Sequence, residues 1–290
     1  MGDGVARLAD VTVVIPVRNA ERLLPACLES ALGQRPHAII VVDGESTDRT
    51  TEIALEYGVT VISDEGRGLP VARQLGVELA ETRYVALVDA DVVLPQSALR
   101  QLRDELQDSG LAALQAGALS TGGPGYWGRA LAQHYQWGRS KNWFGLFATI
   151  FERDTLVRTG FDQQFASGED IELRWRLRQA GVRVGVSQRT IVTHRFADDS
   201  FAFARMQFNM DGHGLGKMIR KYGPRGAPLL GLPAAAAARG VALSVLRLRP
   251  QWIPYYLCFG FFNYAAMLAE LVSSDNDQTR AIPVYGVRPD

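Results

Sequence analysis

The chain has 290 residues, 47% of them hydrophobic, which is enough for the core of one large domain or two ordinary ones. Basic and acidic residues number 31 each, and no basic run carries interleaved aromatic residues, so the sequence argues against a nucleic-acid partner. Cys27 and Cys258 lie far apart among apolar neighbours, and residues 1–10 contain no apolar stretch of signal-peptide length. We therefore expect a globular, cytoplasmic protein with unpaired thiols.

Short apolar runs alternate with segments of helical period over the first 95 residues. The runs at 11–17, 38–43, 59–63 and 84–89 are nearly all apolar, as strands buried on both faces must be. The segments between them repeat Leu, Ile, Val and Ala three and four residues apart, which is typical of a helix with one buried face. This alternation predicts an α/β fold with an open, mostly parallel, Rossmann-like sheet and helices on both faces.

Three carboxylates stand at the ends of these predicted strands. Asp43 ends the second strand, and Asp89 and Asp91 follow the fourth. Taken singly, an Asp after a strand is more often a turn former or a helix cap than a ligand. Because ligands of such sheets bind outside the carboxyl ends of the strands, however, we expect the three to share one edge.

The spacing of Asp89 and Asp91 suggests a particular kind of ligand. Two carboxylates one residue apart can turn their oxygens towards one point, and a hard cation such as Mg²⁺ is usually held by one or two carboxylates together with substrate phosphates. No Cys-x-x-Cys or His-x-x-x-His spacing indicates a zinc site. The pair therefore predicts a hard divalent cation such as Mg²⁺, bound together with a diphosphate.

The regular alternation ends after Pro95. A helix is followed by a Gly- and aromatic-rich stretch, in which Tyr126, Trp127, Trp137 and Trp143 either stack on sugar rings or fill a core as part of a helix at about 126–139. Beyond it, the sequence predicts a strand, a short helix, a loop, an amphipathic helix that ends at Gly181, and two more strands.

The last third, 201–290, is predicted to be helical. The stretch at 226–246 carries one charge and 252–269 carries none, while basic residues flank both. One interpretation is that 226–272 contacts the cytoplasmic face of a membrane. The alternative is a pair of helices that pack on the rest of the chain or on a second copy, which would make the protein a homo-oligomer.

Five motifs in order resemble those of the family 2 glycosyltransferases, which have the GT-A fold. The resemblance covers roughly 11–195. The motifs are a Pro-x-x-Asn opening in VVIPVRNAERLLPACLESAL, an acidic loop in VVDGESTDRT, the helix GLPVARQLGVELA, the Asp-x-Asp pair in VALVDADVV, and a Glu-Asp segment in TGFDQQFASGEDIELRWRL. The Gln-x-x-Arg-Trp motif of processive synthases is absent. The resemblance is therefore to enzymes that transfer a single sugar.

The resemblance implies an activity and a domain arrangement. A single sugar would pass, with inversion and with Mg²⁺ or Mn²⁺, from a nucleotide-diphosphate sugar, a UDP-sugar first, to a hydroxyl of a saccharide or lipid-linked acceptor. The catalytic domain would span 1–200, with a nucleotide-binding half at 11–95 and an acceptor half at 96–200. The helical region at 201–290 would follow it.

The same resemblance assigns donor-binding residues. Asp43 corresponds to the carboxylate that holds the base or ribose of the donor, and Pro16 and Asn19 would line the same pocket. Arg73 stands where the family places a basic side chain near the nucleotide or diphosphate, and Asp89 supports the donor site.

Metal and catalytic roles follow in the same way. Asp91, supported by Asp89, corresponds to the metal ligand, and His194 stands where a further ligand is often found, although a lone His at a strand end is more often a surface or packing residue. Asp170 corresponds to the catalytic base, with Glu169 beside it.

Other functions remain open at the level of the sequence. A metal-dependent nucleotidyltransferase or phosphatase could use the Asp pair on the same sheet, although Val93 stands where such phosphatases expect Thr. A dinucleotide oxidoreductase finds only two of its three glycines, at 66–71. Glu45 and Gln74 depart from the glycosyltransferase pattern and leave the base preference of the donor open.

Overall fold

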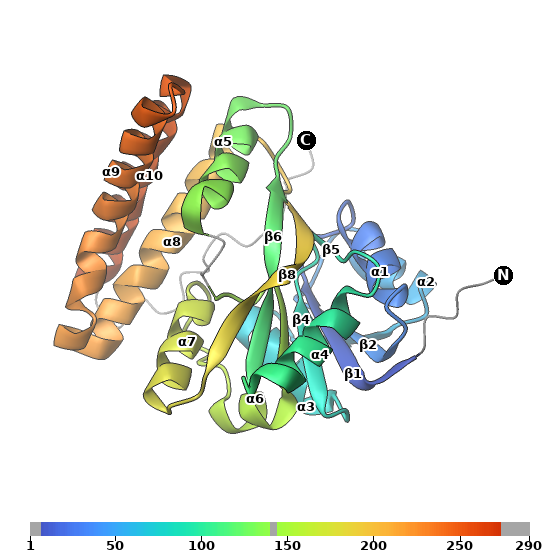
Figure 1. The fold of residues 1–290 in the computed structure, drawn as a ribbon. Helices are drawn as coiled ribbons and strands as arrows, with labels where there is room; N and C mark the ends of the chain where they lie inside the picture. Colours follow the sequence, from blue (N-terminus) through green and yellow to red (C-terminus); the bar gives the residue numbers. More distant parts are fainter. Residues whose placement is uncertain (1–6, 140–143, 274–290) are drawn as a thin grey trace.

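The computed structural model describes residues 7–139 and 144–273, which form an eight-stranded mixed sheet with helices on both faces and a helical hairpin at one side (Figure 1). The strand order is β3-β2-β1-β4-β7-β6-β8-β5. The strands are β1 (Leu8–Val17), β2 (Pro36–Asp43), β3 (Thr60–Ser63), β4 (Tyr84–Val88), β5 (Val92–Val93), β6 (Ala113–Thr121), β7 (Ala148–Glu152) and β8 (Val184–Arg195). The expected open α/β sheet is confirmed.

The half of the sheet formed by β3, β2, β1 and β4 is entirely parallel, as the sequence predicts. Val13 and Ile15 of β1 pack with α1 (Leu24–Leu32), α2 (Thr50–Glu56) and α4 (Ala98–Ser109) on one face. Val14 packs with α3 (Leu69–Leu79), α6 (Arg153–Thr159) and α7 (Glu169–Gln179) on the other. Because successive side chains of a strand point to opposite faces, a run of apolar residues fills both layers.

The other half of the sheet departs from the simple parallel arrangement. β7 is antiparallel to both β4 and β6, and β5 is antiparallel to β8, so four of the seven pairings are parallel. The two strands expected before residue 196 form one strand, β8, whose register with β6 shifts between Gln115 and Gly117. The reversal brings the ends of β4, β5 and β8 together.

The C-terminal helices stand beyond the sheet (Figure 1). They are α8 (Phe201–Tyr222), the short η2 (Gly223–Arg225) and η3 (Ala227–Gly231), α9 (Leu232–Leu246), η4 (Pro250–Trp252) and α10 (Ile253–Val272). Glycines let α8 approach α10 closely, since a Cβ at Gly212 would lie 2.3 Å from the Asn263 carbonyl oxygen and one at Gly216 would lie 2.7 Å from Glu270 Cβ.

A third core joins these helices to α5 (Tyr126–His134) and η1 (Tyr135–Arg139). Trp137 is buried in it, and the ring of Trp127 lies 4.6 Å from that of Phe201. The helix expected at about 126–139 is thus confirmed, and these two indoles fill a core. Trp143 lies outside the described residues.

Candidate functional site

The carboxyl ends of β1 and β2 form one wall of the candidate site. Asp43 lies beside Val17 of β1 and Ser63 of β3 in the sheet register. Its Oδ2 accepts a hydrogen bond of 3.0 Å from the Ser46 amide, which fixes the loop after β2. Its Oδ1 is buried without a hydrogen-bond partner in the described part of the chain, so it can accept one from a ligand.

Asn19 ties the loop after β1 to the loop after β2. Its side-chain Oδ1 accepts a hydrogen bond of 2.8 Å from the Thr47 backbone amide, and its backbone amide donates one of 2.9 Å to Ser46 Oγ. The residue has φ of 47°, a left-handed conformation that Asn adopts more readily than most residues. Pro16 precedes this loop at the buried end of β1. The structure therefore groups Pro16 and Asp43, at the ends of the adjacent strands β1 and β2, with Asn19 in the loop after β1.

Two further residues of this wall were not singled out from the sequence. Asp64 is 1% exposed and accepts from the amides of Gly66 (2.8 Å) and Gly68 (3.0 Å). Burial raises its pKa, opposed by those amides and reinforced by the charge of Asp43. Asp64 directly follows β3, just as Asp43 ends β2. The rule that ligands bind outside the carboxyl ends of the strands could therefore have identified Asp64 from the sequence. Arg18 has a buried Nε without a hydrogen-bond partner among the described residues, and only the fold places it against Gly44.

Asp91 and His194 meet where β5 pairs with β8. His194 Nε2 lies 3.2 Å from Asp91 Oδ2, while Asp91 Oδ1 is buried and has no hydrogen-bond partner in the described residues. Burial opposes protonation of His194, but the charge and hydrogen bond of Asp91 outweigh it and raise the His194 pKa. A carboxylate oxygen and an imidazole nitrogen are side-chain atoms that could hold a divalent cation.

Within residues 7–139 and 144–273, no group of three or more His, Cys, Asp or Glu side chains has metal-binding geometry. Asp89, the expected supporting ligand, instead pairs with Arg73. The unsatisfied Oδ1 of Asp91 nevertheless fits a cation that takes its remaining oxygens from substrate phosphates and water, as Mg²⁺ commonly does.

Arg73 joins the Asp-x-Asp motif to the Glu-Asp motif. Its side chain is 2% exposed, its Nη2 lies 2.7 Å from Asp89 Oδ1, and its Nη1 donates to Glu169. Gly68, with φ of 96°, begins the helix that carries Arg73, and Gly76 lets that helix approach β1, since a Cβ there would lie 2.2 Å from Val14 Cγ1. The guanidinium is therefore inside the protein, between two carboxylates.

Glu169 and Asp170 begin α7. Burial raises the pKa of Glu169 to about 7, the charge of Arg73 opposes the rise, and the charge of Asp170 adds to it. Asp170 Oδ1 accepts from the Ile171 amide at 2.8 Å, and a Cβ on Gly145 would lie 3.3 Å from Asp170 Oδ2. Gly168 precedes this helix and packs closely on α8. A Cβ added to Gly168 would lie 2.9 Å from the Cα of Gly214.

The predicted site residues thus fall into two linked groups. One is the wall of Pro16, Asn19 and Asp43. The other contains six residues, in which His194 contacts Asp91 and Arg73 contacts both Asp89 and Glu169. Asp89 is two residues from Asp91 in the sequence, and Asp170 follows Glu169. β1, which ends in the first group, pairs with β4, which ends at the second. Both therefore lie at one edge of the sheet.

Comparison with other sequences gives the family. Residues 12–165 match the model of Glycosyl transferase family 2. A pre-mycofactocin glycosyltransferase of Mycobacterium tuberculosis (strain ATCC 25618 / H37Rv) is 29% identical over 201 residues, 64% of this chain and 42% of that protein. The uncharacterized glycosyltransferase YibD of Escherichia coli K12 is 39% identical over 88 residues, 28% of this chain and 26% of that protein. The chain spans less than half the length of these relatives.

Solved structures of glycosyltransferases share the GT-A fold. The mannosyltransferase PcManGT of Pyrobaculum calidifontis, in complex with GDP-Man and Mn²⁺, has a TM-score of 0.63 at 19% identity, over 89% of this chain and 87% of that one. TarS 1-349 of S. aureus, in complex with UDP, has a TM-score of 0.52 at 17% identity, over 89% of each chain. With a family model matching more than half of its length, the protein belongs to glycosyl transferase family 2.

Proposed function

We propose that this protein transfers a single sugar from a nucleotide-diphosphate sugar to a hydroxyl of a saccharide or lipid-linked acceptor, with inversion. The observation that carries the proposal is that Arg73 pairs with both Asp89 and Glu169, which joins the turn that carries the proposed metal ligand Asp91 to the helix start that carries Asp170. Phosphatase or nucleotidyl-transfer chemistry needs no such second carboxylate. The match to glycosyl transferase family 2 independently favours glycosyl transfer.

Each residue has a role in this proposal. Asp43 accepts a hydrogen bond from the base or ribose through its unpaired Oδ1, with Pro16 and Asn19 shaping the pocket. Asp91 and His194 would hold the Mg²⁺ or Mn²⁺, which stabilises negative charge on the leaving diphosphate when bound. Arg73 acts as a positioning residue, because its buried guanidinium holds Asp89 and Glu169 in place.

Asp170 takes the proton from the acceptor hydroxyl. Its Oδ2 makes no hydrogen bond with another described residue, whereas its Oδ1 is used by the Ile171 amide. As the proton leaves, the hydroxyl oxygen bonds to the anomeric carbon on the face opposite the nucleoside diphosphate, which departs with the electron pair of the broken bond. Attack from the opposite face inverts the anomeric configuration.

The experiment pairs nucleotide binding with sugar transfer. UDP and GDP with Mn²⁺ are titrated calorimetrically, and UDP-sugars and then GDP-mannose are assayed for transfer. We expect Asp170→Asn to bind nucleotide as the parent does and to lose transfer by about 100-fold or more. Asp108→Asn on α4, an exposed carboxylate remote from the site, is the matched control. Full transfer activity in Asp170→Asn would refute the role of Asp170 as base.

We also propose that the α9–α10 hairpin rests on a membrane surface. Ala227–Leu246 and Pro250–Val272 are long and apolar enough to cross a membrane, and only 17% and 33% of their most apolar stretches are buried inside the protein. Leu257, Phe261 and Leu268 lie along one exposed face of α10, and Leu248 at the hairpin turn is 89% exposed beside Arg249.

Ion pairs on α8 favour surface contact over a full crossing. Glu270 of α10 lies 3.3 Å from Arg220 and 3.3 Å from His213 of α8. Arg220 and Lys221, two of the basic residues that flank the apolar segments, form ion pairs within the protein, while Arg225 and Arg249 are exposed. If α10 crossed the bilayer, the charged side chains that pair it with α8 would have to enter the bilayer as well, which is costly. Contact with the membrane surface avoids this cost.

Vesicle flotation tests the membrane contact. The double variant Leu257→Asp with Phe261→Asp should lose binding to phosphatidylcholine vesicles that contain phosphatidylglycerol. Leu55→Asp, which changes a comparably exposed leucine on α2, should keep it. If the parent protein does not float, and the double variant instead converts a dimer to a monomer in light scattering, the face is a contact between two copies of the chain.

A further inference from the structure

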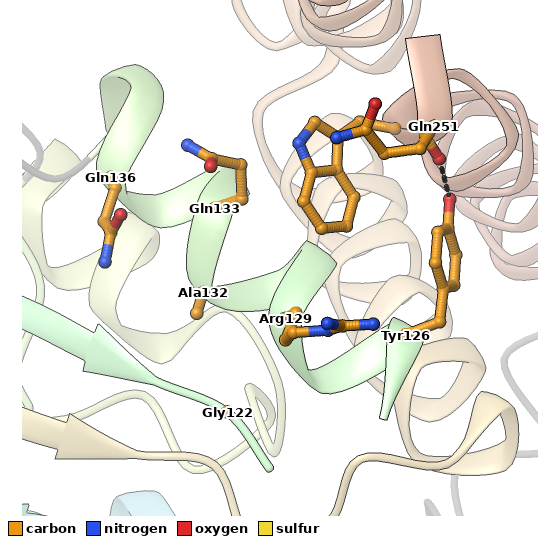
Figure 2. Close-up of a pocket in the computed structure, with 8 residues that line it drawn as sticks. Gly122, Tyr126, Arg129, Ala132, Gln133, Gln136 and Gln251 are labelled. Carbon is orange, nitrogen blue, oxygen red and sulfur yellow. Dashed lines mark hydrogen bonds between the residues drawn. The ribbon is translucent and has the colours of Figure 1, made fainter. Parts of the chain in front are cut away.

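A cavity of about 400 Å³ lies between α5 with η1 and the turn that joins α9 to α10 (Figure 2). It is lined by none of the residues placed in the proposed active site. The lining residues are Gly122, Tyr126, Arg129, Ala132, Gln133, Gln136, Gln251 and Trp252. A cavity of this size holds a monosaccharide-sized ligand.

One wall of the cavity is a stripe of polar side chains. Tyr126, Arg129, Gln133 and Gln136 follow one another at intervals of three, four and three residues, which places them on one helical face. The opposite wall comes from the hairpin turn, where the Gln251 carbonyl accepts a hydrogen bond of 2.7 Å from Tyr126 Oη (Figure 2). Figure 2 shows Arg129 and Gln133 on successive turns of α5, with Arg129 nearer to the Tyr126–Gln251 hydrogen bond.

The cavity presents hydrogen-bond donors that the described residues leave unused. The Arg129 guanidinium makes no ion pair or hydrogen bond within the described chain, and neither does the Gln133 amide. No lining residue is acidic. The cavity therefore suits a ligand that brings acceptor oxygens and negative charge.

The cavity is also close to the proposed metal ligands. Gln136 Nε2 donates to the Ser120 carbonyl at 3.3 Å, and Ser120 of β6 lies opposite His194 of β8 in the sheet register. The ring of Tyr135, the residue before Gln136, lies 5.9 Å from the ring of His194. Since paired strands are about 4.8 Å apart, one end of the cavity is about one strand away from the Asp91–His194 pair.

We propose that this cavity binds a phosphate group carried by the acceptor, a proposal that rests on the proposed glycosyl transfer for its link to the reaction. Arg129 would take two phosphate oxygens with its planar guanidinium. Gln133 would donate to the remaining oxygens or to the attached polyol. The phosphate belongs either to a soluble sugar phosphate or to a lipid headgroup, which the adjacent hairpin turn would bring to the same place.

Calorimetry on the full chain tests the cavity apart from the donor site. Glucose 6-phosphate and glucose are each titrated into protein already saturated with Mn²⁺ and UDP, so that the nucleotide pocket is filled. We expect glucose 6-phosphate to bind, and Arg129→Gln to weaken that binding by about tenfold or more. Arg158→Gln, which removes an exposed arginine on α6, should change it by less than twofold. Glucose should show no dependence on Arg129.

A second arm identifies the source of the phosphate. If the lipid headgroup is the ligand, phosphatidylcholine vesicles containing phosphatidic acid should bind the Arg129→Gln protein more weakly than the parent and the Arg158→Gln protein, because only the apolar face of α10 would still hold the variant. Equal behaviour of Arg129→Gln and the parent with both probes, or binding of neither probe, overturns the proposal. Nucleotide binding is measured on the same samples. Its absence from the parent would remove the proposed function, while an Arg129-dependent phosphate signal would still identify the cavity.

Discussion

Arg73 Nη2 lies 2.7 Å from Asp89 Oδ1, and the arginine side chain is 2% exposed. The same guanidinium donates to Glu169, 96 residues further along the chain. One buried cation therefore connects the turn that carries the proposed metal ligand to the helix that carries the proposed base. Removing either partner of a buried ion pair leaves an uncompensated charge, so this contact should govern stability as well as activity.

Arg73→Met should lower the free energy of unfolding by about 3–5 kcal/mol, because it leaves the Asp89 and Glu169 carboxylates without a cation. The free energy of unfolding of Arg73→Lys should lie between those of the parent and of Arg73→Met, because lysine keeps the charge but cannot pair with two carboxylates in the way a guanidinium does. Urea denaturation gives both values. Arg83→Met, whose arginine is 67% exposed and 3.8 Å from Glu152, should change stability by less than about 0.5 kcal/mol. An Arg73→Met protein as stable as the parent would show that the pairing of Arg73 with Asp89 and Glu169 does not stabilise the fold.

The titration of Glu169 should appear in the pH dependence of stability. Its pKa in the folded protein, about 7, is above the ordinary value of 4.5, so the folded state binds more protons between these pH values. The resulting stability is complete below about pH 4.5 and is lost as pH rises through 7. Relative to Glu169→Gln, the parent should lose about 3 kcal/mol over this window. A stability difference between the two proteins that stays constant from pH 4.5 to 8 would show that Glu169 titrates normally.

Gly168→Ala should impair catalysis through the backbone. Gly168 has φ of 79°, and a Cβ there would lie 2.9 Å from Gly214 Cα, so α7 must shift and carry Asp170 with it. We expect a loss of stability of about 1–3 kcal/mol and a fall in transfer rate that exceeds any fall in UDP affinity. Gly181→Ala is the control, because Gly181 has φ of 71° and nothing lies within 4 Å of its added Cβ. It should show only the backbone cost of about 1 kcal/mol, with transfer unchanged.

His194→Ala should weaken nucleotide binding only in the presence of metal. With Mn²⁺ we expect the affinity for UDP to fall by about tenfold, because the loss removes one proposed ligand and frees Asp91 Oδ2 from its contact at 3.2 Å. With EDTA the variant and the parent should bind UDP equally. Calorimetric titrations under the two conditions provide the comparison, and an equal loss under both would indicate that His194 supports the pocket by packing rather than by holding metal.

Much of the fold follows from local sequence. An apolar run of five to seven residues cannot be satisfied on both faces except inside a sheet covered by helices, so the parallel half from β1 to β4 was predictable. The strand-end rule likewise placed Asp43, Asp89 and Asp91 at one edge, and applied to β3 it would have found Asp64. The Glu-Asp motif marked the start of α7.

Other features were decided by contacts between segments that are distant in the sequence. Burial of Arg73 between Asp89 and Glu169 depends on α3 and α7 packing on the same face, and a sequence gives no measure of that distance. Whether Trp127 and Trp137 met a sugar or a core was settled by the C-terminal helices that cover them. The cavity beside Arg129 is formed by segments distant in the sequence, since Tyr126 on one wall bonds to Gln251 on the other, 125 residues away.

The sequence by itself determined which residues could form strands, helices and strand-end carboxylates, since hydrophobic period and turn chemistry act over a few residues. The tertiary structure alone decided which charges became partners and which donors stayed free. Those outcomes depend on burial and on distances of a few ångströms between elements, where the strength of an electrostatic contact changes most steeply.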